Sequence, residues 1–259
     1  MTEYWLFDPS GNITALIPMP DDTPYNPSAA EAVMRAEPSC EQAGFVLSGP
    51  AQCDARLEMA GGEFCGNASL CTAALIALRT DVPVGATVRL RIAVSGTEDP
   101  VSVSLERQEE SFFKGSIVMP PVTEIRDILL PGQEFPLPVV FMPGIAHTIV
   151  PETFGLGRAE AVIREWCAAL NVPAMGIQLA DPAFTRLTPL VYVPAARTLY
   201  RENSCASGTA AAGALLAYRQ QSGVSLCFKE PGGTLFVTAD PDGSVTLRNT
   251  VRLLRQAFI

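Results

Sequence analysis

The sequence predicts an α+β fold of two similar lobes, each with a sheet around one buried helix. First, 22 prolines and 20 glycines divide the 259 residues into many short apolar runs, and runs rich in β-branched or aromatic residues between turn residues are typical of strands. Second, the segments TAALIAL and TAAAGALLAY have no polar face, and a helix that is apolar all round is a buried one. Third, these two segments belong to a repeat.

The two apolar helices align without gaps when Cys65 is placed over Cys205. CGNASLCTAALIAL then lies over CASGTAAAGALLAY, and an acidic residue, Glu63 or Glu202, precedes each cysteine closely. Two Ala-rich helices can look alike by composition alone, but composition does not explain a cysteine at both starts. The 140-residue separation is about half of the chain, which predicts two lobes that each wrap a sheet around such a helix. We expect one lobe at 1–120, with 250–259 returning to it, and a second at 121–249.

Pattern and turn residues predict the individual elements in order. Helices are expected at 27–35, 65–78, 157–170 and 205–221, the third of them on the surface because charged residues alternate with its apolar ones. Expected strands are 4–8, 13–17, 45–48, 87–95, 101–105, 112–119, 138–142, 187–193, 226–229, 234–238 and 244–248. The Asp-Gly pair at 242–243 and the Gly-Gly pair before Thr234 favour hairpin turns.

Composition excludes several classes of partner. A net charge of −9 and a pI near 4.7 oppose binding to nucleic acid or to an anionic membrane surface. No apolar stretch approaches the roughly 20 residues that span a bilayer, and the first residues lack a basic and an apolar signal region. A cytoplasmic location is the default expectation.

The rare residues narrow the chemistry. His147 is the only histidine, which argues against a His-rich metal site. A pyridoxal enzyme needs a Schiff-base lysine, and only Lys114 and Lys229 exist, in ordinary contexts. Seven cysteines without a C-x-x-C pair indicate free thiols, and we expect Cys40, Cys53, Cys71, Cys167 and Cys227 to be structural.

A cysteine at a helix N-terminus is suited to proton transfer. The unpaired N–H groups and the positive end of the macrodipole can lower a thiol pKa from about 8.5 to roughly 3.5–7.5. The same N–H groups, at Gly66, Asn67, Ala206 and Ser207, can bind a carboxylate. With a thiol on each side, a small acid held there could lose a proton from one face and regain one on the other. An amino acid has such an acidic α-hydrogen.

These motifs resemble the cofactor-independent, two-cysteine amino acid racemases and epimerases of the diaminopimelate epimerase superfamily, over essentially the whole chain. The pairs Gly11-Asn12 and Glu41-Gln42 and the motifs GGEFCGNAS and SCASGTAAAG are similar to that family's conserved motifs. The resemblance implies two pseudo-symmetric β-barrel-like lobes around central helices, with Cys65 and Cys205 as thiolate and thiol in the cleft. It implies no cofactor and no metal, and a small amino acid as substrate, and a homodimer is the oligomer to expect.

The resemblance also suggests the residues that bind substrate. These are Asn12, Gln42, Gly66, Asn67, Glu202, Ala206 and Ser207, with Glu41, Arg197 and His147 as further candidates. We expect Ala206, which stands where the family has Gly, to have helical dihedrals.

Departures from the family's motifs bear on the substrate. Ala196 replaces the Glu that precedes the family's Arg, here Arg197, and Ile145 replaces an Asn. This chain therefore lacks residues with which the family binds the far half of diaminopimelate. TPLVYV and ENSC are more similar to the histidine racemase subgroup that supplies opine-type metallophores, and histidine is our preferred substrate. Diaminopimelate epimerisation is the alternative within this mechanism. A non-racemase isomerase or binding protein of the same fold, and a thiol redox protein, are the other classes.

Overall fold

The computed structural model describes residues 1–20 and 27–259, which form two compact units. Unit 1 comprises Met1–Val118 and Arg248–Ile259, and unit 2 comprises Met119–Leu247. The fold is α+β. Among the described residues, no helix is long and apolar enough to cross a membrane.

Unit 1 contains a closed barrel of eight strands. Its strands are β1 (Glu3–Asp8), β2 (Thr14–Pro18), β3 (Gln42–Leu47), β4 (Ala55–Met59), β5 (Thr87–Val94), β6 (Val101–Arg107), β7 (Phe112–Val118) and β16 (Val245–Phe258). They are hydrogen-bonded in that order, and β1 also pairs antiparallel with β16. This second pairing leaves the barrel without an open edge.

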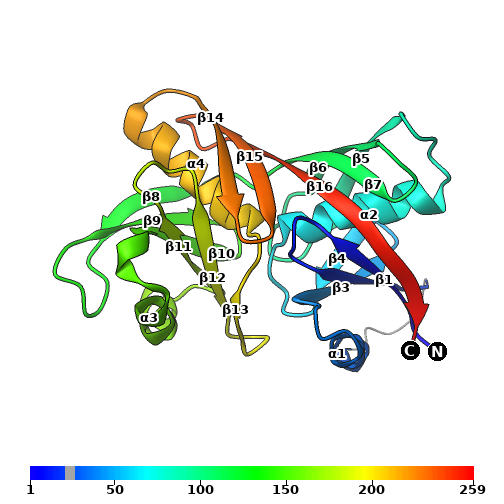
Figure 1. Ribbon diagram of the computed structural model, residues 1–259, viewed down its shortest axis with the longest axis horizontal. Coiled ribbons are helices and arrows are strands. Elements are labelled where there is room, and N and C mark those ends of the chain that lie inside the picture. The colour runs from blue at the N-terminus through cyan, green and yellow to red at the C-terminus, as the bar shows by residue number, and fades with distance from the viewer. Residues whose placement is uncertain (21–26) are drawn as a thin grey trace. The chain divides into compact units, whose positions relative to one another are not determined.

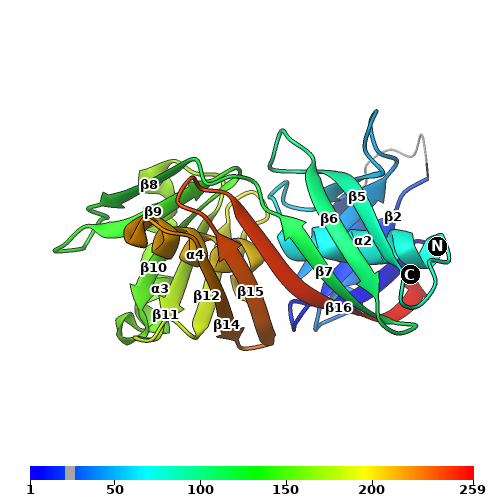
Figure 2. The same ribbon diagram turned by 90° about the horizontal axis from the view of Figure 1, so that it is seen from above.

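Helix α2 (Gly66–Arg79) packs against β2, β4, β5, β6 and β7 of this barrel. Figure 2 shows β5, β6, β7 and β16 side by side with α2 behind them. The helix approaches β7 so closely that a Cβ at Gly115 would lie 2.6 Å from Leu70 Cδ2. Helix α1 (Pro27–Ala36) packs on β2 and β3 instead, with Ala30 and Val33 in an apolar cluster that includes Phe45.

Unit 2 contains a six-stranded sheet and a hairpin (Figure 1). The sheet order is β13 (Thr198–Arg201), β12 (Leu187–Val193), β11 (Met175–Ala180), β10 (Ile145–Pro151), β9 (Leu137–Met142) and β8 (Glu124–Ile128). The hairpin joins β14 (Val224–Glu230) to β15 (Gly233–Ala239), and β15 lies beside β16.

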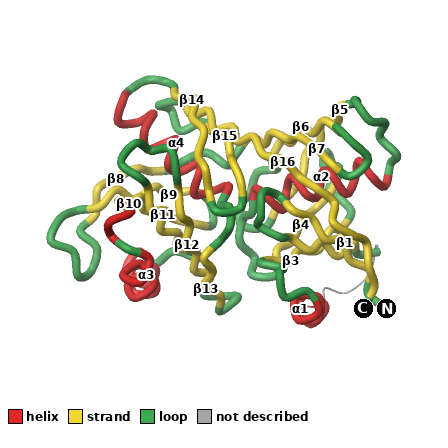
Figure 3. Tube along the Cα trace, in the orientation of Figure 1, coloured by secondary structure: helices red, strands yellow, loops and turns green. Residues whose placement is uncertain are grey.

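Two helices of unit 2 pack on this framework. Helix α3 (Leu156–Leu170), which follows a 3-10 turn at Glu152–Phe154, contacts β11 and β12, with Trp166 fully buried. Helix α4 (Ala206–Gln220) contacts β9, β10 and β11 and also the hairpin β14–β15, beside which it lies in Figure 3.

The predicted helices and the Asp-Gly turn are confirmed, whereas several strands were not predicted. Strands β4, β8, β10, β11 and β13 had no counterpart in the sequence analysis, and β16 extends ten residues past its predicted end at 248. Both β10 and β11 are buried almost throughout, so they lack the polar–apolar alternation that identifies a half-exposed strand.

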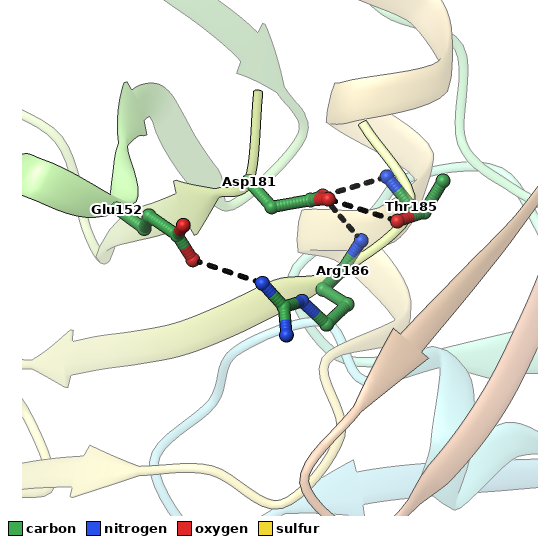
Figure 4. A network of polar contacts seen from close by, with 4 residues as sticks. All are labelled: Glu152, Asp181, Thr185 and Arg186. Atoms are coloured by element: carbon green, nitrogen blue, oxygen red, sulfur yellow. Dashed lines mark hydrogen bonds and ion pairs between the residues drawn. The ribbon is translucent and has the colours of Figure 1, made fainter. Parts of the chain in front are cut away.

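A buried aspartate closes the turn between β11 and β12 (Figure 4). Asp181 accepts hydrogen bonds from the backbone N–H groups of Thr185 and Arg186, each 2.7 Å long, and from the Thr185 hydroxyl at 2.9 Å. The Arg186 N–H makes the largest contribution to lowering the pKa of this carboxyl. The turn also holds β14, because the Lys229 N–H donates to the Thr185 carbonyl oxygen at 2.8 Å.

We expect Asp181→Ala to lower the melting temperature by a few degrees, because two backbone donors and a hydroxyl lose their acceptor. The melting temperature of Asp181→Asn should lie between those of Asp181→Ala and the wild type. Since the carboxylate pKa is lowered in the folded state, the wild type should lose its advantage over Asp181→Asn as the pH falls into the acid range. Differential scanning calorimetry at neutral and acid pH measures both effects, and an unchanged melting temperature for Asp181→Ala would contradict them.

Candidate active site

Both buried helices begin at a cysteine with the same backbone geometry. Cys65 has φ −134° and ψ 111°, and Cys205 has φ −126° and ψ 101°. Each is therefore an extended N-cap residue whose chain turns into a helix at the next position. The first ten residues of α2 and of α4 are buried, and so is the twelfth of each. The two segments are therefore alike in backbone conformation and burial as well as in sequence.

At the start of α2, the Cys65 thiol is hydrogen-bonded on two sides. Its sulfur accepts from the Ala68 N–H at 3.3 Å, as an N-cap side chain does, and donates to Gln42 Oε1 at 3.2 Å. The Ser69 hydroxyl donates to the Cys65 carbonyl oxygen at 2.8 Å. Gln42 is the first residue of β3, so the barrel wall supplies the thiol's acceptor.

Gln42 belongs to a polar network inside unit 1. Its Nε2 donates to Asn12 Oδ1 at 2.7 Å, and the same oxygen accepts from Asn67 Nδ2 at 3.0 Å. Asn12 Nδ2 donates in turn to Glu41 Oε2 at 2.6 Å. Asn12 and Asn67 are each 1% exposed, so these polar groups depend on one another for their hydrogen bonds.

At the start of α4, Ser207 lies between the second thiol and the only histidine. The Ser207 hydroxyl is 3.6 Å from Cys205 Sγ and 2.9 Å from His147 Nε2. Gln178 Nε2 lies 3.3 Å from His147 Nδ1 on the other side of the ring. Burial lowers the pKa of His147 to about 3, so this imidazole is neutral at physiological pH and carries one ring proton.

Strand alternation aims these two side chains at α4. His147 pairs with Gly176, and Ile149 with Gln178, in the parallel ladder of β10 and β11, so His147 and Gln178 share one face of the sheet. Ala146 and Ile177, which precede His147 and Gln178 in their strands, face the other way and pack in the apolar cluster that includes residues of α3. The imidazole occupies the space that a side chain at Gly176 would need, because a Cβ there would lie 2.0 Å from His147 Nδ1.

A buried carboxyl also meets the start of α4. Glu230, the last residue of β14, accepts from the Cys205 N–H at 2.7 Å and contacts the Thr209 hydroxyl with its other oxygen. Burial raises the pKa of Glu230 to about 8, although both of these hydrogen bonds act in the opposite direction. At neutral pH this side chain is therefore largely protonated.

The predicted lowering of the thiol pKa is wrong for Cys205. Burial raises the pKa of this thiol well above its ordinary value, and the negative charges of Glu202 and Glu230 raise it further. The Ser207 hydroxyl lowers the pKa, but by less. Helix position alone did not predict this, because the sequence could not show that Cys205 is only 4% exposed.

The structure assembles most of the predicted site residues around one cysteine or the other. Asn12, Glu41, Gln42, Gly66 and Asn67 surround Cys65, whereas Glu202, Ala206, Ser207 and His147 lie near Cys205. Ala206 is the first residue of α4 and is absent from the positions with positive φ, as expected. Arg197 lies apart, exposed with φ 56° in the turn between β12 and β13.

Some residues of these networks were not predicted as site residues. They are Thr14, Gln178, Glu230 and Asn249. Glu230 and Gln178 carried one signal, a polar residue within or ending an apolar strand, which in a buried strand indicates a hydrogen-bonded role.

Comparison with known proteins identifies related chains. A family model described as the histidine racemase CntK N-terminal domain matches residues 2–253. A histidine racemase of Staphylococcus aureus (strain Mu50) is 28% identical over 248 residues, covering 92% of this chain and 88% of the relative. A histidine racemase of Fusobacterium nucleatum is 32% identical over 218 residues, covering 82% and 80%.

Solved structures share the fold at lower identity. A probable proline racemase from Agrobacterium radiobacter K84 superposes with a TM-score of 0.73 at 13% identity, over 100% of this chain and 93% of that one. A predicted epimerase from Pseudomonas aeruginosa superposes with a TM-score of 0.71 at 17% identity, over 100% and 99%.

We expect Glu230→Gln to gain stability relative to the wild type as pH rises. A carboxyl whose folded pKa is about 8, against an ordinary value of 4.5, stabilises the fold below the ordinary value and loses that contribution as pH rises through about 8. Glutamine can accept from the Cys205 N–H and does not titrate. Urea unfolding at pH 5, 7 and 9 should show the difference growing to several kcal/mol.

Glu109→Gln is the matched control, since Glu109 is exposed in the turn before β7. Its difference from the wild type should stay within about 0.5 kcal/mol at all three pH values. A pH-independent difference for Glu230→Gln would show that Glu230 ionises normally in the folded protein.

Proposed function

The chain belongs to the histidine racemase family, and on this premise we propose that it interconverts L- and D-histidine without a cofactor, using Cys65 and Cys205 as two bases. The observation that carries the proposal is the pair of buried helices, each with a cysteine N-cap of the same backbone geometry and burial. One cysteine would suffice for a nucleophile. Two in equivalent places suit a reaction with two equivalent halves.

Racemisation requires one proton to leave the α-carbon and another to reach its opposite face. One sulfur, as thiolate, takes the α-proton, and the electron pair of the Cα–H bond delocalises into the carboxylate. The other sulfur, as thiol, then gives its proton to the opposite face. The two sulfurs have thereby exchanged protonation states, and the same pair catalyses the reverse direction.

We propose that first-turn N–H groups serve as donors to a substrate carboxylate, those of Gly66 and Asn67 at the start of α2 in unit 1 and those of Ala206 and Ser207 at the start of α4 in unit 2. The first N–H groups of a helix have no partner within it, and the macrodipole adds positive potential there. Negative charge builds up on the carboxylate as the α-proton leaves, so such donors stabilise the transition state more than the ground state.

The remaining site residues have proposed roles in holding the substrate. Asn12 and Gln42 present amides beside Cys65, with Glu41 behind Asn12. Glu202, whose charge raises the pKa of Cys205, suits the ammonium or the imidazole of histidine. His147 is proposed as a neutral polar partner of Ser207. Arg197 has no proposed contact with substrate, because it lies exposed in the β12–β13 turn.

We also propose that the fold is that of the diaminopimelate epimerase superfamily, each unit being one of two related lobes. Support comes from the eight-stranded barrel packed on α2 and from the equivalent N-cap geometry and burial of α2 and α4. Ala196 and Ile145, at positions where that superfamily binds the far half of diaminopimelate, favour histidine as the substrate.

We expect racemisation to depend on both cysteines. Proton NMR in D₂O with reductant should show loss of the α-proton signal of histidine with the wild-type protein. Cys65→Ala and Cys205→Ala should each lower the rate of racemisation by about 10²- to 10⁴-fold or more, because each removes one acid–base group. Polarimetry or chiral chromatography provides the second readout.

Cys227→Ala is the matched control, since it removes an exposed thiol of unit 2 and should leave the rate unchanged. Diaminopimelate serves as the comparison substrate. Exchange of diaminopimelate without exchange of histidine, or full activity in either cysteine variant, would overturn the proposal.

The rate should also rise with pH above neutrality. Since burial raises the pKa of the Cys205 thiol, little of it is thiolate at pH 7, and each pH unit below that pKa should change kcat/KM by about tenfold. Initial rates between pH 6.5 and 8.5 measure the slope. A flat profile over this range would mean that Cys205 is already ionised or takes no part.

A further inference from the structure

We propose that Cys65 holds its proton in the substrate-free protein and enters turnover as the proton donor, because a network of fixed amides turns only an acceptor toward its sulfur. The inference rests on the proposed function and assigns the Cys65 thiol its starting state. Glu41, Asn12 and Asn249 would be positioning residues that act on Cys65 through Gln42.

The Asn12 amide is oriented from one side by a carboxylate. Asn12 Nδ2 donates to Glu41 Oε2 at 2.6 Å, and the NH₂ group of an amide is a donor only. The nitrogen of Asn12 must therefore face Glu41. Its oxygen then points to the opposite side, toward Gln42 and Asn67.

A backbone donor fixes the same orientation from the other side. The Thr250 N–H can only donate, and it donates to Asn249 Oδ1 at 2.8 Å. Asn249 Nδ2 is thereby directed to Asn67 Oδ1 at 3.0 Å, and Asn67 Nδ2 to Asn12 Oδ1, also at 3.0 Å. Two independent anchors thus require the Asn12 oxygen to be an acceptor.

Gln42 inherits its orientation from two acceptors. Asn12 Oδ1 accepts one hydrogen of its Nε2 at 2.7 Å. Thr14 Oγ1 accepts at 2.8 Å, since the threonine's own proton goes to the Asn12 carbonyl oxygen. With both amide hydrogens used, Gln42 presents Oε1 to Cys65 Sγ at 3.2 Å. An oxygen acceptor stabilises the S–H form and repels the thiolate.

The second thiol has a partner of another kind in unit 2. Its neighbour Ser207 has a hydroxyl that can rotate to donate or accept. With Cys65 as S–H, turnover begins in the fraction of molecules whose Cys205 is ionised and can remove the α-proton, and burial keeps that fraction small at pH 7. After turnover Cys205 carries that proton and Cys65 is the thiolate, so proton exchange with water resets the pair.

Thiol alkylation tests the inference without any substrate. Iodoacetamide reacts with the thiolate, so the pH at which alkylation of Cys65 is half-maximal reports its protonation, whereas the plateau rate reports access. In the full-length protein, Gln42→Ala should lower this midpoint and raise the rate at pH 7 by about two- to tenfold, because water that can donate replaces the acceptor. Gln42→Glu should raise the midpoint, since a carboxylate repels the thiolate more strongly.

A double variant tests the positioning role. Asn12→Ala removes one of the two anchors of Gln42, so it should move the midpoint in the same direction as Gln42→Ala, by less. The double variant Asn12→Ala/Gln42→Ala should match Gln42→Ala alone, because Asn12 acts only through the amide. A further shift in the double variant would show that Asn12 acts on Cys65 independently and would refute the relay.

Two internal controls accompany the measurement. Gln108→Ala, in the turn between β6 and β7, should leave the midpoint unchanged. Cys71 is fully buried on the same helix, so it should stay unlabelled in any variant that folds, and fragment spectra of the shared peptide separate it from Cys65. Should Gln42→Ala expose Cys71, the opposite shifts of Gln42→Glu and Asn12→Ala provide the test.

The result overturns the inference if Gln42→Ala leaves the midpoint unchanged or raises it with Cys71 protected. The readout is independent of activity. If the protein racemises histidine but the midpoint does not move, the proposed function stands and this inference fails. If the midpoint moves but the protein racemises nothing, the state of Cys65 stands and the proposed function fails.

Discussion

The structure depends on how a helix can begin inside a protein core. The first N–H groups of any helix lack partners within it, and leaving them unpaired away from water is costly. Helices α2 and α4 are both buried from their first residue, so polar groups must be brought to their starts by the surrounding strands. The polar interior of each unit gathers at this point for that reason.

The two units meet this requirement with different chemistry. Unit 1 surrounds the start of α2 with amides, and its network extends from Glu41 through Asn12 and Asn67 to Asn249. Unit 2 places a carboxyl, Glu230, on the Cys205 N–H, and Ser207 leads to the neutral His147. Equivalent backbones thus hold two sulfurs in unlike surroundings, and a shared fold position does not require a shared protonation state.

Support for the start of α4 reaches outward to the edge of unit 2. Asp181 closes the β11–β12 turn, and that turn binds β14 through the bond from Lys229 to Thr185. The next residue along β14 is Glu230. The surface turn therefore holds the end of β14 in place, and this positions the Glu230 carboxyl to accept from the Cys205 N–H.

The helices, the two cysteines and their local neighbours could be predicted because their signals are local. The N-cap cysteine is followed at once by small residues, and the apolar helix bodies have no polar face. The partnership of His147 with Ser207 could not be predicted, since it depends on the face of the buried strand β10 from which the imidazole projects, and β10 lacks the polar–apolar alternation that would indicate this face. The same limit applied to the pKa of Cys205, where burial set by distant strands outweighs the helix terminus.

Strand β16 affects the order in which the two units can complete their folding during synthesis. Unit 1 contains the first residues and the last ones, and its barrel closes only when β16 pairs with β1. On a ribosome, β1 to β7 emerge first but must wait for the whole of unit 2 to be synthesised before their missing neighbour arrives. The lobe that is made first is therefore completed last, and until then the edge of β1 that β16 will cover remains open to other chains.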